Sequence, residues 1–82
     1  MSTAALLLKL EQVTTAKIAE LAKLYDGMDT KAVAAMMASL DDTTIVAVLP
    51  RMKQKNASIV LGLMPPVRAA SISKQMIMVA EN

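Results

Sequence analysis

Large apolar residues recur at intervals of twelve in the second part of the chain, at Met28, Leu40, Met52, Met64 and Met76. After each of them come polar or turn-forming residues, and then small or branched apolar residues at spacings of three and four. Such spacings place side chains on one face of an α-helix. The pattern predicts four short helices joined by tight corners. Because one short helix cannot bury its apolar face alone, each unit should pack against the next.

We therefore expect an all-α fold, a right-handed superhelix of short helices in 12-residue repeats that follows one long amino-terminal helix. In this scheme residues 1–27 form the long helix and residues 28–82 form the repeat domain. The methionines that open the repeats are expected in the core, where flexible thioethers fill irregular gaps.

Residues 3 to about 26 contain neither Pro nor Gly and predict one long helix. It should end at Gly27, because glycine tolerates the positive φ common just after a helix. The later half is apolar on one side only, whereas the first half is apolar on more than one face. Such surplus apolar surface favours a contact with a second chain, although the segment also fits a fold-back onto its own core. The residues expected to mediate self-association are Leu6, Leu7, Leu10 and Val13.

Asp residues precede two of the predicted short helices, at Asp29 and at Asp41 or Asp42. A carboxylate there accepts free backbone N–H groups of the first turn and complements the helix dipole. Pro50 should end or kink a helix, and Pro66 suits a first helical position. The expected short helices are residues 30–39, residues 42–49, a third that ends at Leu63, and residues 67–79.

Composition removes several classes of function. The 82 residues suit one domain. They include neither His nor Cys, so a His-dependent triad, an imidazole zinc site and thiolate chemistry are excluded within this chain. The acidic residues lie mostly at helix-cap positions and no glycine-rich phosphate loop is present, so we expect no enzyme, no catalytic residue and no cofactor. The net charge is +2 and Tyr25 is the only aromatic residue, which argues against a nucleic-acid partner.

Two groups of residues are candidates for a binding role. Adjacent carboxylates suit Mg²⁺, so Asp41 and Asp42 are the candidate metal ligands, although paired Asp residues at a helix start are common without metal and no metal is expected. The basic cluster at the third corner suits an acidic partner, and a solvated corner explains it equally well. The residues predicted to bind a partner protein are Met37, Arg51, Lys53 and Lys55.

Several short motifs extend over roughly residues 20–78. They are Leu24-Tyr25 before Met28-Asp29, Ala32 to Met37, Leu40-Asp41-Asp42, Arg51-Met52-Lys53, and Ala57 with Ile59 to Leu61 before Met64-Pro65. These motifs resemble the intracellular amino-terminal domain of MgtE-type magnesium transporters. They are more similar still to the version of that domain in the flagellar motor protein MotE and related flagellar proteins.

The resemblance implies a helical superhelix, and residues 3–20 as the tail of a coiled coil that precedes the domain in the flagellar relatives. It implies a non-enzymatic protein–protein interaction module, a MotE-like chaperone or scaffold for stator assembly, with a flagellar stator or motor component as partner. A periplasmic location and membrane attachment through segments outside this chain would follow, whereas the expected homodimer rests on the apolar first half of the long helix. The alternative is a magnesium-sensing regulatory domain of an MgtE-type transporter, which would be cytoplasmic. A cytoplasmic location is also expected if the chain is complete as given.

Overall fold

The computed structural model describes the backbone of residues 3–81 and the side chains of residues 15–78. Within residues 3–81 every regular element is helical and no strand occurs, so the all-α prediction is confirmed. The elements are α1 (Thr3–Asp26), α2 (Thr30–Met37), α3 (Asp42–Val48), the 3-10 turn η1 (Leu49–Arg51), α4 (Gln54–Leu63) and α5 (Pro66–Glu81).

Helices α2 to α5 begin at intervals of twelve residues, at Thr30, Asp42, Gln54 and Pro66. At the start of each helix, a backbone amide donates to the carbonyl of the residue just before the helix, four residues earlier, at 2.9–3.2 Å. These amides belong to Val33, Ile45, Ala57 and Ala69. One amide at each preceding corner donates to the carbonyl three residues earlier at 3.1–3.2 Å; these belong to Met28, Leu40, Met52 and Met64. The apolar interval read from the sequence therefore coincides with the spacing of helix starts and corners.

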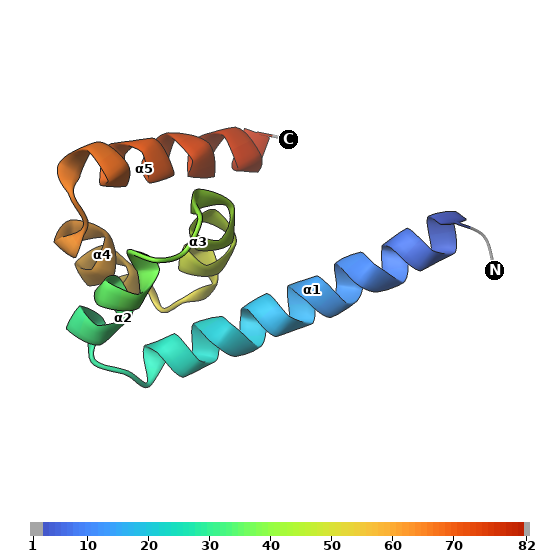
Figure 1. Cartoon of the computed structure of the whole chain (residues 1–82), viewed down its shortest axis with the longest axis horizontal. Helices are drawn as coiled ribbons and strands as arrows, with labels where there is room; N and C mark the ends of the chain where they lie inside the picture. Colours follow the sequence, from blue (N-terminus) through green and yellow to red (C-terminus); the bar gives the residue numbers. More distant parts are fainter. Residues whose placement is uncertain (1–2, 82) are drawn as a thin grey trace.

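A single interior joins the helices. Helix α2 packs against α4, and α3 packs against both α1 and α5. In Figure 1, α3 lies between α1 and α5, and the first half of α1 extends beyond the other helices. The core is aliphatic and thioether in character, and its seven largest fully buried side chains are Val33, Met37, Ile45, Val48, Leu49, Val60 and Ile72. Isolated helices as short as α2, α3 and α4 are unstable in water, so this shared interior is what stabilises them.

The helix ends agree in part with the sequence prediction. Pro66 is the first residue of α5, as expected. Helix α3 ends at Val48, and Pro50 lies in η1, because a residue without a backbone N–H cannot continue the α-helical hydrogen bonds. Helix α2 ends two residues earlier than predicted, at Met37, and α5 continues to Glu81.

Helix α1 ends at Asp26, beside the predicted stop at Gly27, but two further expectations at this end are wrong. Gly27 does not adopt a positive φ. Its amide donates to the carbonyl of Leu24 and that of Met28 donates to the carbonyl of Tyr25, both at 3.1 Å, so the helix ends through i to i+3 hydrogen bonds without a left-handed residue. Met28 is 40 % exposed rather than buried, because it lies in the turn and Tyr25 fills the interior there. The core prediction is confirmed for Met52 and Met64, which are buried, and for Met76, which packs against the core.

Two isoleucines of α5 test the shared interior. Ile72 is fully buried and Ile77 is 61 % exposed. Ile72→Ala should lower the free energy of unfolding by about 2–5 kcal/mol, because a cavity replaces core contacts. Ile77→Ala should change it by less than about 0.5 kcal/mol. Urea unfolding followed by circular dichroism measures both, and equal effects of the two variants would contradict the assigned core.

Candidate interaction surfaces

Asp26, at the end of α1, caps the amino end of α4. Its Oδ1 accepts hydrogen bonds from the backbone N–H of Lys53 at 3.0 Å and from Asn56 Nδ2 at 2.9 Å, and its Oδ2 lies 3.2 Å from the same Lys53 nitrogen. Lys53 occupies the N-cap position of α4, and its own side chain makes no capping bond. A carboxylate from a distant helix thus satisfies a backbone group that the local sequence leaves unpaired. Sequence reasoning missed this role, for which the one signal is a Lys where a capping residue belongs.

The two local Asp caps behave differently. Asp29 accepts the backbone N–H of Lys31 at 3.3 Å, which confirms its predicted role at α2. Asp41 occupies the N-cap position of α3 but makes no capping bond to the backbone, and it accepts the hydroxyl hydrogen bond of Thr44 instead. The capping prediction for Asp41 is therefore wrong in its hydrogen bonds, although the position is right.

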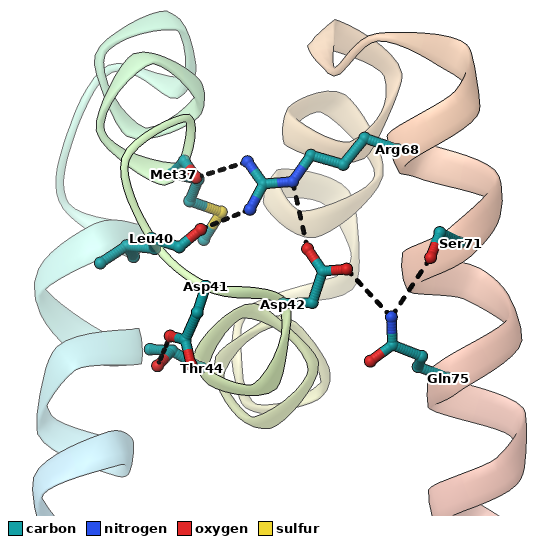
Figure 2. A network of polar contacts seen from close by, with 8 residues as sticks. All are labelled: Met37, Leu40, Asp41, Asp42, Thr44, Arg68, Ser71 and Gln75. Atoms are coloured by element: carbon teal, nitrogen blue, oxygen red, sulfur yellow. Dashed lines mark hydrogen bonds and ion pairs between the residues drawn. The ribbon is translucent and has the colours of Figure 1, made fainter.

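Arg68 of α5 ties the corner between α2 and α3 to the last helix. Its Nη1 donates to the carbonyl of Met37 at 2.8 Å and its Nη2 donates to the carbonyl of Leu40 (Figure 2). Its Nε donates to Asp42 Oδ1 at 3.2 Å in an ion pair whose side chains are 25 % and 38 % exposed. The planar guanidinium therefore satisfies two carbonyls near the end of α2 and a carboxylate at the start of α3 together.

Gln75 completes this network. Its Nε2 donates to Asp42 Oδ2 at 3.0 Å and lies 3.2 Å from Ser71 Oγ (Figure 2). Both oxygens of Asp42 are thus engaged, while Asp41 is paired with Thr44. A cation on Asp42 would have to displace Arg68. The part of the chain with described side chains holds no group of three or more acidic, His or Cys side chains arranged for a metal.

The predicted basic cluster is on the surface. Arg51 lies in η1, Lys53 precedes α4 and Lys55 lies in its first turn, and all three are exposed. Lys23 of α1, which the sequence prediction did not include, joins them: it lines an open hollow of about 430 Å³ together with Arg51, Ala19 and Glu20. We call these four cationic residues, Lys23, Arg51, Lys53 and Lys55, the basic corner.

An apolar groove of about 530 Å³ lies between α2 and the corner that joins α4 to α5. It is lined by Lys31, Ala34, Ala35, Ala38, Leu63, Met64, Pro65 and Arg68. Leu63 is 47 % exposed, and Val67, just beyond the corner, is 85 % exposed. The groove is therefore an accessible, mainly apolar surface.

Met37 does not belong to this surface. Its side chain is fully buried, so its prediction as a surface anchor is wrong, and the neighbouring Met36 is 40 % exposed instead. One residue turns a helix by about 100°, which separates adjacent methionines between core and solvent. The predicted self-association residues Leu6, Leu7, Leu10 and Val13 lie outside the residues whose side chains are described.

Comparisons with protein-family models, with curated proteins and with solved structures give no match to this chain. Among the helices of the described residues, none is long and apolar enough to cross a membrane.

The role of Arg68 is testable with a conservative variant. Arg68→Lys keeps the charge but loses the planar fork, which leaves carbonyls at the α2 corner without their donors. The free energy of unfolding should fall by about 1–3 kcal/mol. Arg51→Lys is the matched control, because Arg51 is exposed, and it should have an effect below about 0.5 kcal/mol. Thermal unfolding measures the difference, and a neutral Arg68→Lys would refute the proposed tie between α2, α3 and α5.

Proposed function

We propose that this chain is a non-enzymatic protein–protein interaction module. The observation that carries the proposal is the open apolar groove between α2 and the α4–α5 corner, beside which large apolar side chains are exposed. Apolar surface of this kind gains free energy when a partner covers it.

For the architecture we propose a right-handed superhelix of 12-residue repeats preceded by one long amino-terminal helix. The equal spacing of the starts of α2 to α5, and of the backbone hydrogen bonds at their corners, supports the repeat. Each turn of the superhelix would then bury its apolar face on the next, and the last copy would need either a polar outer face or a partner.

We further propose that the chain forms a homodimer through the first half of α1. This part of α1 extends beyond the other helices in Figure 1, and its sequence has apolar residues at Leu6, Leu7, Leu10 and Val13. A second copy of the same segment would cover them by pairing helix against helix.

The biological setting that we propose rests on the motif resemblance: a MotE-like chaperone or scaffold of a bacterial flagellar motor, with a stator or motor component as partner. Such a protein would act in the periplasm and reach the membrane through segments outside this chain. The geometry disfavours the alternative, a cytoplasmic magnesium-sensing domain of an MgtE-type transporter. Its candidate ligand Asp42 already accepts hydrogen bonds from Arg68 and Gln75.

The dimer is tested by replacing Leu6, Leu7, Leu10 and Val13 together with Gln, a good helix former that removes apolar surface. The mass in solution should fall from that of a dimer to that of the 8.7 kDa monomer, with the helical circular-dichroism signal retained. Leu63→Gln with Ile77→Gln is the control, because both side chains are exposed in other helices, and it should leave the mass unchanged. A monomeric wild-type chain, or a dimer that survives all four substitutions, would exclude this interface.

A further inference from the structure

In the described part of the chain, most carboxylates have partners within the fold while several cations belong to no ion pair, and the net charge of +2 does not show this difference. Four of these carboxylates have internal partners near helix starts: Asp26 at α4, Asp29 at α2, Asp41 with Thr44 and Asp42 with Arg68. The two ion pairs found among the described side chains are Lys17–Glu20 at 3.4 Å and Arg68–Asp42 at 3.2 Å. None of the four cations of the basic corner belongs to either pair.

The residues of the basic corner come together from two distant parts of the chain. Lys23 lies three residues before Asp26, and the Asp26 carboxylate holds the backbone of Lys53 at 3.0 Å. Arg51 shares a hollow with Lys23, so α1 and η1 present these two cations on one surface. The capping contact of Asp26 therefore also fixes the position of this charged surface.

Helix stability accounts for Lys23, which lies in the last turn of α1, but not for Lys53 and Lys55 at the start of α4. The amino end of a helix carries a partial positive charge, so nearby cations weaken it. The first turn of α4 has no acidic residue, and the carboxylate nearest to it, Asp26, already accepts hydrogen bonds from Lys53 and Asn56. An external group of negative charge would relieve this repulsion, which is the complementarity expected of a docking surface.

We propose that the basic corner docks a carboxylate-rich segment of a partner protein, with a partner side chain seated in the hollow between Lys23 and Arg51. The Arg51 guanidinium suits a carboxylate through two parallel hydrogen bonds, and Lys53 and Lys55 supply further positive charge. Glu20 also lines the hollow, where it is paired with Lys17. Because its negative charge repels other carboxylates, the carboxylates of the partner should lie on the side of Arg51. The inference rests on the proposed role as an interaction module and names the chemistry of one partner.

A protein fits this surface better than the other polyanions. Nucleic acids that bind as single strands need aromatic side chains for stacking, and the one aromatic residue, Tyr25, is 6 % exposed. A membrane presents a broad plane of charge, whereas Lys23 and Arg51 line a hollow of about 430 Å³ that accepts a protruding side chain.

The test titrates the full chain with a synthetic Glu- and Ala-rich peptide at low salt and follows the backbone amides by NMR. The amides of residues 19–23 and 51–55 should shift, and a peptide with Gln in place of Glu should leave them unmoved. Lys23→Gln with Arg51→Gln should weaken peptide binding roughly tenfold. Lys74→Glu changes the net charge by the same two units at an exposed position outside both the basic corner and the apolar groove, and it should leave the affinity near that of the wild type.

Equal weakening in the Lys23→Gln, Arg51→Gln variant and in the Lys74→Glu control, or shifts outside these residues, would overturn the proposal. So would tighter binding of phosphatidylserine vesicles or of a single-stranded oligonucleotide at the same residues. The mass in solution of the Lys23→Gln, Arg51→Gln variant should equal that of the wild type. An unchanged mass shows that this variant assembles like the wild type, so its loss of peptide binding reports on acidic docking and not on the proposed dimer.

Discussion

Burial of aliphatic and thioether side chains in one shared interior is the constraint on which the rest of this structure depends. Helices α2, α3 and α4 have between 7 and 10 residues, too few to be stable in isolation. Each contributes at least one fully buried side chain to the common core, and α5 contributes Ile72. The helices are therefore formed by their neighbours rather than by their own propensities, and the corners must hold them at fixed positions.

Long-range polar contacts hold those corners. Asp26 joins the end of α1 to the start of α4, and Arg68 joins α5 to the corner between α2 and α3. These contacts engage carboxylates inside the fold and leave cations such as Lys23 and Arg51 at the surface. The same arrangement that stabilises the fold thus determines the chemistry that it offers to a partner, which is why both surface proposals concern proteins rather than metals.

Local features of the fold follow from the sequence, and long-range ones do not. The helical class, the Asp29 cap and the start of α5 at Pro66 depend on neighbours within one turn, and all were predictable. The contacts of Asp26 and Arg68 join residues at least 26 positions apart, and no spacing rule reveals them. The surface position predicted for Met37 is wrong because Met36 and Met37 both fit the apolar pattern, and only the packing of α2 decides which one is buried. For the predicted interaction site, the pattern revealed the cations near α4 but missed the one that α1 brings to them.

Native-state amide hydrogen exchange tests the shared interior most directly. The amides of Met37, Val48, Val60 and Ile72 represent the four carboxyl-terminal α-helices, one amide in each. If the helices form a single cooperative core, these amides should exchange with similar free energies, within about 1 kcal/mol of one another and close to that of global unfolding. Full protection in one helix with unprotected exchange in another would show that the helices are stable independently, and would contradict this account.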